Sequence, residues 1–125
     1  CEAGPAMNST VRLATLDDLS VYSDLAHRFH AASPMANVCK FDRIGYAEFF
    51  KSSIVNPNIA FWIAEIDGVA AGISGALLYP LYFSPSHLVA QELWWFLTPD
   101  ARGSGAGDLL FKAIEKWAKE KLKNG

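Results

Sequence analysis

The sequence is poor in cysteine, in net positive charge and in long apolar runs. Each of these shortages argues against one class of protein. Cys1 and Cys39 are the two cysteines, so we expect no disulfide framework and a reducing compartment. The net charge of −2 gives no reason to expect a nucleic-acid partner. No window reaches the roughly 18 uninterrupted apolar residues of a membrane span. With no recognisable signal peptide, a cytoplasmic protein without membrane association is the expectation.

The composition is that of one folded domain. The chain has 125 residues, of which 51% are hydrophobic and 13% aromatic, which is enough to form a core. We interpret residues 1–6, which precede Met7, as a remnant of expression, and residues 7–125 as a single domain. Cys39 is then its lone thiol, and we expect it to be half-buried rather than nucleophilic. His27 and His30 lack further imidazole ligands nearby in sequence, so no metal site is expected.

The first half of the chain predicts one strand followed by two helices. Residues 11–14 alternate as a short strand. Thr15 and Asp18 have the spacing of a capping box that begins a helix, and Pro34 ends it. Asp42 is placed to cap the second helix.

The second half predicts a hairpin, a further strand and a final helix. The β-rich runs 59–66 and 69–79 flank Asp67-Gly68, the strongest short-range hairpin signal. Gly72 and Gly75 in the second run suggest a bulge or a close backbone approach.

An aromatic segment separates this hairpin from the next strand. We expect residues 80–86 to form a loop and residues 88–97 to form the strand. Tyr79, Tyr82 and Phe83 would line a substrate pocket or sit at the edge of the core.

A glycine-rich loop between that strand and an amphipathic helix is the chemical centre of the sequence. The strand ends at Leu97, glycines follow at 103, 105 and 107, and a helical apolar stripe runs over 108–123. Such a loop turns successive backbone N–H groups toward one point at the positive end of a helix dipole. It therefore predicts a site for a phosphate-bearing cofactor.

The spacing of the glycines excludes two nucleotide-binding loops. A P-loop needs a lysine directly after its second glycine, where this chain has Asp108. The dinucleotide fingerprint needs Gly-x-Gly-x-x-Gly and a following strand, and neither is present.

A third pattern, Arg/Gln-x-x-Gly-x-Gly/Ala, fits Arg102-Gly103-Ser104-Gly105-Ala106-Gly107 at every defined position. Leu97-x-Pro99 precedes it and Trp117-Ala118-Lys119 follows it. On these residues the chain resembles the GNAT superfamily of N-acetyltransferases from about Val11 to Lys123. The resemblance implies an α/β (α+β) fold with a mixed, mostly antiparallel sheet flanked by helices, in the order β-α-α-β-β-β-α.

The resemblance also implies acetyl-CoA as the cosubstrate, without a metal, and a primary amine of a small molecule or protein as the acceptor. Backbone amides of the loop would hold the pyrophosphate, with small residues allowing a close approach. A Cβ at Gly105 or Gly107 would collide with the phosphates or the strand. Backbone groups of the strand would pair with pantetheine. The implied cofactor-binding residues are Trp95, Phe96, Leu97, Arg102, Gly103, Ser104, Gly105, Ala106 and Gly107.

Glu92 is the candidate general base, five residues before Leu97, where some members of the family carry a catalytic Glu. In an otherwise apolar strand its carboxylate would be partly desolvated, which suits a base. Alternatively, it is a strand-edge Glu that contacts a Lys or Arg. Gln91 would point to the opposite face, and His87 is a weaker candidate.

The chain departs from the family after its last helix, where only Asn124-Gly125, a good C-cap, remains. The family continues with a strand, a helix and two strands. We therefore expect a C-terminally incomplete domain that needs about 40 further residues for activity, or one completed by another chain or a homodimer. The alternative function is a non-catalytic GNAT-like module that binds CoA or a protein.

Overall fold

The structure is a computed structural model, and it describes residues 8–123. The expected remnant at 1–6 and the expected C-cap at 124–125 lie outside these residues. The elements are β1 (Ser9–Leu13), α1 (Leu19–Ala32), α2 (Arg43–Ile54), β2 (Ile59–Ile66), β3 (Val69–Leu81), β4 (Ser84–Leu97) and α3 (Ala106–Lys123). Short 3₁₀ turns occupy Leu16–Asp18, Pro34–Asn37 and Pro99–Ala101. This order confirms the predicted one.

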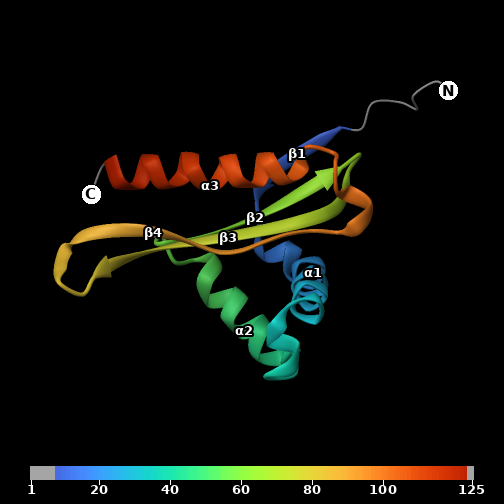
Figure 1. Ribbon diagram of the computed structural model, residues 1–125, viewed down its shortest axis with the longest axis horizontal. Coiled ribbons are helices and arrows are strands. Elements are labelled where there is room, and N and C mark those ends of the chain that lie inside the picture. Colours follow the sequence, from blue (N-terminus) through green and yellow to red (C-terminus); the bar gives the residue numbers. More distant parts are fainter. Residues whose placement is uncertain (1–7, 124–125) are drawn as a thin grey trace.

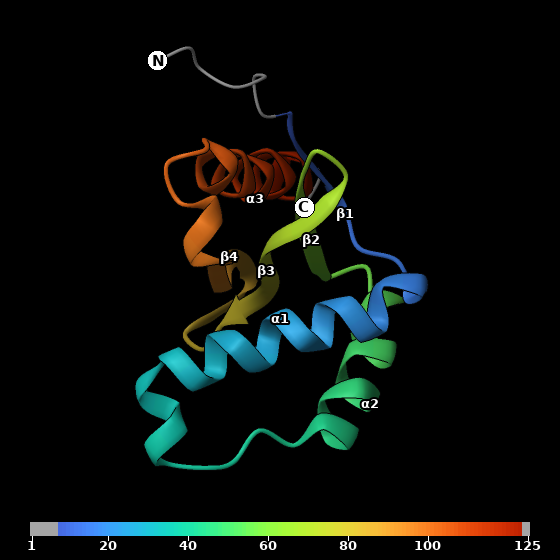
Figure 2. The same ribbon diagram turned by 90° about the vertical axis from the view of Figure 1, so that its right-hand side faces the viewer.

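The four strands form one antiparallel sheet in chain order, β1-β2-β3-β4, so β1 and β4 are its edges (Figure 1). The helix α3 covers one face, while α1 and α2 cover the other, which gives three layers (Figure 2). The predicted fold class is confirmed.

Each face of the sheet has its own core. On the α1 and α2 side, the buried side chains include Tyr22, Phe50 and Phe61. On the α3 side, Leu110 and Ile114 pack against the small residues of β2 and β3. Each fully buried large apolar side chain contributes about 1.5–3 kcal/mol, so the two layers of helices are held mainly by burial.

The helix boundaries follow the predicted caps. An oxygen of Asp42 accepts a hydrogen bond from the amide of Gly45 at 2.9 Å, one turn into α2. Ser33, before Pro34, is extended (φ −103°, ψ 161°) and ends α1. The carboxylate of Asp18 accepts from the amide of Thr15 at 2.7 Å.

The predicted loop over residues 80–86 is wrong. Strand β3 runs to Leu81 and β4 starts at Ser84, which leaves a two-residue turn. The amide of Leu78 donates to the carbonyl of Asn58, the residue before β2 begins. Pro80 lies two residues further along β3, so its nitrogen points to the same side, where β2 has no residue opposite it. Its missing N–H therefore costs no ladder hydrogen bond. Tyr82, which is 92% exposed, lies at the tip and not in the core.

Gly72 and Gly75 mark both a close approach and a bulge. A Cβ on Gly72 would lie 2.8 Å from the carbonyl oxygen of Phe96 on β4. Gly75 pairs with Trp94 and Ala76 with Glu92, so the register shifts by one residue between these pairs. The extra residue in β4 is Leu93.

Two hydrogen bonds of Tyr22, one partly and one fully buried, connect α1 to the two last strands. The indole N–H of Trp94 donates to the hydroxyl of Tyr22 at 2.8 Å. That hydroxyl donates in turn to the backbone carbonyl of Ser74 at 2.7 Å. Tyr22 is fully buried, so burial raises the pKa of its hydroxyl and keeps it protonated.

The Tyr22→Phe substitution should lower the free energy of unfolding by about 2 kcal/mol, because it removes both hydrogen bonds of a buried hydroxyl. Tyr46→Phe is the matched control, since the hydroxyl of Tyr46 is buried and has no hydrogen-bond partner among residues 8–123. Its removal should leave the free energy of unfolding unchanged or raise it. Urea denaturation measures both, and equal losses would contradict the assignment.

A second stability test uses Asp18, whose carboxylate pairs with Arg12 at 2.8 Å. Hydrogen bonds from Arg12 lower the pKa of Asp18 from 3.8 to about 2. Because the folded-state pKa is the lower one, the carboxylate stabilises the fold above about pH 4, and this contribution is lost as the pH falls toward 2.

Asp18→Asn should therefore cost about 1 kcal/mol at pH 7, a value limited by solvent screening of the partly exposed Arg12. The gap from the unmodified chain should shrink between about pH 4 and pH 2. Asp17→Asn removes an exposed neighbouring carboxylate with no hydrogen bond or ion pair in the described part of the chain, and serves as the control. A gap independent of pH would refute the role of Asp18.

Candidate functional site

The glycine-rich loop connects the end of β4 to the start of α3. Thr98 anchors its beginning, because its buried amide donates to the carbonyl of Ala71 at 2.9 Å. Gly103 and Gly105 have φ angles of +85° and +90°. These are left-handed conformations that favour glycine, so the two glycines let the chain reverse before the helix begins.

The loop leaves several backbone donors available. The amide of Ser104 donates to Ala101, and that of Ala106 donates to the Ser104 hydroxyl at 3.2 Å. Within residues 8–123, the amides of Gly103, Gly105 and Gly107 donate no hydrogen bond. Together with the positive end of the α3 dipole, they form a cradle that suits a phosphate.

The two glycines that were expected to be crowded differ in their surroundings within the chain. A Cβ on Gly107 would lie 3.2 Å from the Leu97 side chain, so the strand does restrict this position. A Cβ on Gly105 would meet no atom within 4 Å. The chain itself therefore leaves room at Gly105, where the expected collision with the phosphates stays a prediction, and the constraint within the chain is the backbone conformation, with a φ of +90°.

The cofactor-binding residues predicted on β4 lie at the edge of the sheet. Trp95, Phe96 and Leu97 pair with β3 on one side, and no described strand pairs with them on the other. Trp95 is 48% exposed, and its indole N–H donates to the carbonyl of Gly107 at 3.0 Å. Trp95 thus ties the strand edge to the first turn of α3.

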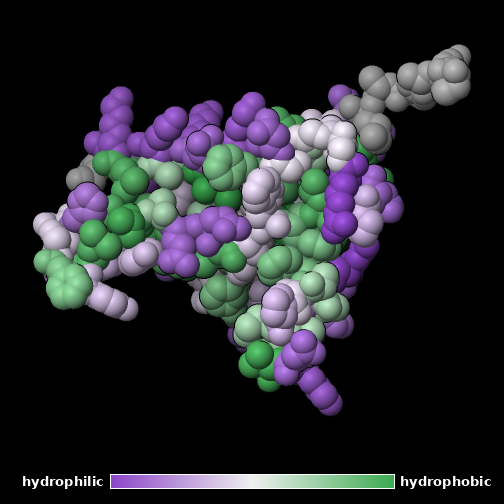
Figure 3. All heavy atoms as spheres, in the orientation of Figure 1, coloured by the Kyte–Doolittle hydropathy of each residue, from purple (hydrophilic) through white to green (hydrophobic). Residues whose placement is uncertain are grey.

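The space-filling view shows the same edge from outside (Figure 3). Hydrophilic residues follow the upper side of α3, and hydrophobic residues lie below it on both sides of a hydrophilic patch in the middle of the view. Phe111 belongs to this apolar surface, with its ring 5.5 Å from that of Trp95. The edge therefore offers both unpaired backbone groups and apolar contacts. Arg102, at the start of the motif, is exposed to solvent.

Glu92 is exposed, so the expected partial desolvation of its carboxylate is wrong. The bulge at Leu93 explains the difference. Strict alternation would put Glu92 on the same face as Trp94, but the bulge places it opposite Ala76, which packs under α3. The alternative expectation also fails, because Glu92 makes no ion pair with the Lys and Arg residues of the described range. Gln91 lies on the opposite face, as expected.

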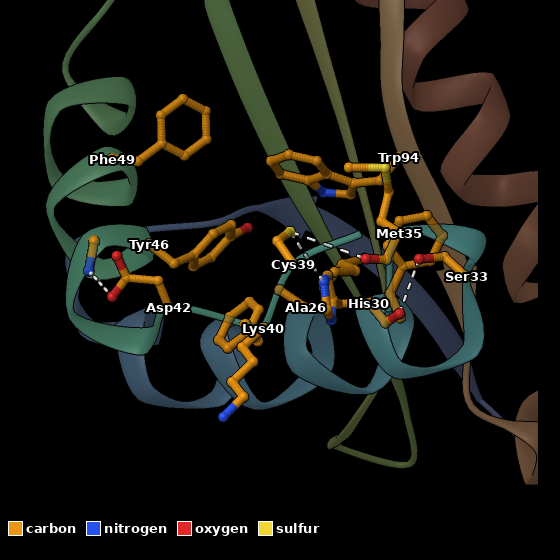
Figure 4. A pocket seen from close by; sticks show the side chains of 14 residues that line it. Ala26, His30, Ser33, Met35, Cys39, Lys40, Asp42, Tyr46, Phe49 and Trp94 are labelled. Atoms are coloured by element: carbon orange, nitrogen blue, oxygen red, sulfur yellow. Dashed lines mark hydrogen bonds between the residues drawn. The ribbon is translucent and has the colours of Figure 1, made fainter. Parts of the chain in front are cut away.

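A groove of about 430 Å³ lies between α1 and α2 under the sheet (Figure 4). Tyr79 and Tyr82, which were expected to line a substrate pocket or the edge of the core, lie outside this groove, in a separate pocket with Leu77, Leu81 and Gln91. The groove is lined by Ala26, Phe29, His30, Ser33, Met35, Cys39, Lys40, Phe41, Asp42, Gly45, Tyr46, Phe49, Ile73 and Trp94.

Several aromatic rings line this groove, and the hydroxyl of Tyr46 lies among them. The rings of Tyr46 and Trp94 are 6.0 Å apart, and those of Phe49 and Trp94 are 6.3 Å apart. The buried hydroxyl of Tyr46 points toward the middle of the groove (Figure 4). Burial raises its pKa well above the ordinary value, so it is a neutral donor and acceptor.

Cys39 differs from its predicted setting. Its thiol is exposed rather than half-buried, and Sγ lies 3.7 Å from Nε2 of His30. Sequence analysis could not place a base beside this cysteine, because the two residues meet only when the segment after α1 folds back. His27, in contrast, stacks on Phe41 with ring centroids 4.7 Å apart.

Two further observations concern the described residues as a whole. Residues 8–123 contain no cluster of three or more His, Cys, Asp or Glu side chains that could hold a metal ion. None of their helices has the length and apolar character needed to cross a membrane.

Comparisons with solved structures find the same fold. A predicted acetyltransferase from Clostridium acetobutylicum, solved with acetyl-CoA, is 17% identical with a TM-score of 0.73, and the match covers 91% of this chain and 75% of that one. An aminoglycoside N-acetyltransferase in complex with CoA is 19% identical with a TM-score of 0.76, covering 96% and 75%. A ribosomal-protein-alanine N-acetyltransferase from Brucella melitensis biovar Abortus 2308 is 19% identical with a TM-score of 0.67, covering 93% and 74%.

A search of curated protein sequences finds no match. The family model of the acetyltransferase (GNAT) family, however, matches residues 20–124, which include the whole glycine-rich loop and α3. The chain belongs to the GNAT family of acetyltransferases.

Proposed function

We propose that this protein transfers the acetyl group of acetyl-CoA to a primary amine of a small molecule or a protein. The cradle of amides that donate no hydrogen bond within residues 8–123, beside the edge of β4 that no described strand pairs with, is the observation that carries the proposal. In the reaction, the amine nitrogen bonds to the thioester carbonyl carbon while the carbon–sulfur bond breaks. The amine loses a proton, and the released thiolate gains one.

The chain contributes binding and orientation. The amides of Gly103, Gly105 and Gly107 would hold the pyrophosphate, with Arg102, Ser104 and Ala106 completing the loop around it. The backbone of residues 95–97 would pair with the pantetheine arm as an added strand would. The hydrogen bond from Trp95 to the carbonyl of Gly107 holds the end of β4 and the glycine-rich loop in a fixed relative position.

Glu92 would accept the proton of the amine. Its carboxylate has no ion-pair partner in the described chain, and solvent reaches it. Because it faces the α3 side of an edge strand, water passing around that edge would connect it to an amine on the other side.

A second candidate is a module that binds CoA without catalysis. The exposed position of Glu92 favours it, because a solvated carboxylate on the α3 face is less suited to a base than a desolvated one. Binding of CoA without thiol release on any amine would support this candidate.

The Gly105→Trp substitution should abolish CoA binding, because the indole would occupy the space in front of the amides. Isothermal titration with CoA measures this. Gly68→Trp is the control: Gly68 has a φ of +83° and open space around its Cβ, but lies in the turn between β2 and β3. Both variants carry backbone strain of about 1–3 kcal/mol. Equal CoA affinities for the two variants would refute the loop assignment.

Glu92→Gln should slow acetyl transfer by about 100-fold or more and remove the acidic limb of the pH–rate profile, since a carboxamide accepts no proton. The dissociation constant of CoA should not change. Thiol release from acetyl-CoA with an amine panel measures the rate, and Gln91→Ala, on the opposite face, is the control. An unchanged rate would remove Glu92 from the mechanism.

A further inference from the structure

We propose that the groove between α1 and α2 binds a monoamine with an apolar body, and that the nitrogen of this amine hydrogen-bonds to the hydroxyl of Tyr46. This inference rests on the proposed function, because it names the class of acceptor that the same enzyme would acetylate.

The hydroxyl of Tyr46 is the first reason. It is buried and has no hydrogen-bond partner among residues 8–123, an arrangement that is unfavourable unless a ligand completes it. A neutral phenol can donate to the lone pair of an amine, or accept from an ammonium group. A nitrogen in the groove therefore satisfies this group in either protonation state.

The walls of the groove are the second reason. Phe49 and Trp94 present aromatic rings to the same space as Tyr46 (Figure 4). Phe41 also lines the groove, with its ring 5.4 Å from that of Tyr46. Such rings accept an apolar body by burial of its surface and attract a cation to their faces. The volume of about 430 Å³ suits a small molecule or a single side chain.

The charges of the groove argue against a polycation. Asp42 is the one acidic side chain among the lining residues, and it already accepts the hydrogen bond of Gly45 that caps α2. Lys40 lines the same groove and adds a positive charge. An aminoglycoside or a polyamine needs several carboxylates, so the groove matches one amine rather than many.

The groove also lies next to the proposed path of acetyl-CoA. Trp94 forms part of its wall, and Trp95, the following residue on β4, contacts the first turn of α3. The indole of Trp94 is held by Tyr22 and cannot turn away without losing that hydrogen bond. An amine near Tyr46 would therefore meet the thioester across the free edge of β4.

Cys39 supplies a direct test without CoA, because its exposed thiol lies in the groove. In a Cys1→Ser background, the rate at which a disulfide reagent modifies Cys39 is measured with increasing 2-phenylethylamine, kanamycin or spermidine. We expect 2-phenylethylamine to slow the modification at saturation, and the two polycations to leave it unchanged. Titration calorimetry gives the corresponding dissociation constants.

Tyr46→Phe should weaken the binding of 2-phenylethylamine about fivefold, since one hydrogen bond is lost. Tyr79→Phe, in β3 outside the groove, is the matched control and should bind as the unmodified chain does. Equal affinities for these two variants, lack of protection by 2-phenylethylamine, or equal protection by kanamycin would overturn the proposal.

The two proposals fail in different ways. Protection of Cys39 by 2-phenylethylamine without any binding of CoA would support the groove as an amine site and refute the transferase. Thiol release with polycationic amines, while Cys39 stays fully reactive, would support the transferase and refute the groove as its acceptor site.

Discussion

Two consecutive hydrogen bonds, from Trp94 to the buried hydroxyl of Tyr22 and from that hydroxyl to the carbonyl of Ser74, determine how α1 is placed against the sheet. They fix α1 against both β3 and β4 at one point, where dispersion and burial alone would tolerate sliding. The ring of Trp94 then becomes a rigid wall of the groove. Its neighbour Trp95 reaches the other face and contacts Gly107. Adjacent residues of one edge strand thus hold the two halves of the proposed site.

The bulge at Leu93 is what allows this arrangement. It puts Leu93 and Trp94 against the same core, beneath α1 and α2, and turns Glu92 toward α3. The proposed base and the proposed acceptor groove therefore lie on opposite faces of a strand that has a free edge. In this arrangement the proposed transfer would take place around the edge of β4 that no described strand pairs with.

Local sequence patterns predicted the helices, the strands and the glycine-rich loop. Features that depend on contacts between distant segments were not predicted. The Asp67-Gly68 turn has φ angles of 52° and 83°, as a two-residue hairpin requires. The loop from Arg102 to Gly107 was predicted because its motif is defined by a fixed local spacing of residues. The extent of β3 was missed, since Pro80 is allowed only where β2 has already ended. The lining residues His30, Cys39 and Tyr46 of the groove were not predicted as neighbours, because they come from separate segments of the chain. The orientation of Glu92 depended on a bulge that residue alternation does not reveal.

The order of the strands also has a consequence for the folding of the chain. The strands β2, β3 and β4 are joined by two-residue turns, so each can pair with the next soon after it forms. The strand β1 pairs with β2 only after both α1 and α2 have been enclosed, and the hydrogen bond from Asn8 to Asp67 spans 59 positions. Closing so long a loop carries a greater entropic cost than closing a hairpin. We therefore expect the three-stranded meander of β2, β3 and β4 to form first. The strand β1 would pair with β2 last, after α1 and α2 have packed against the sheet.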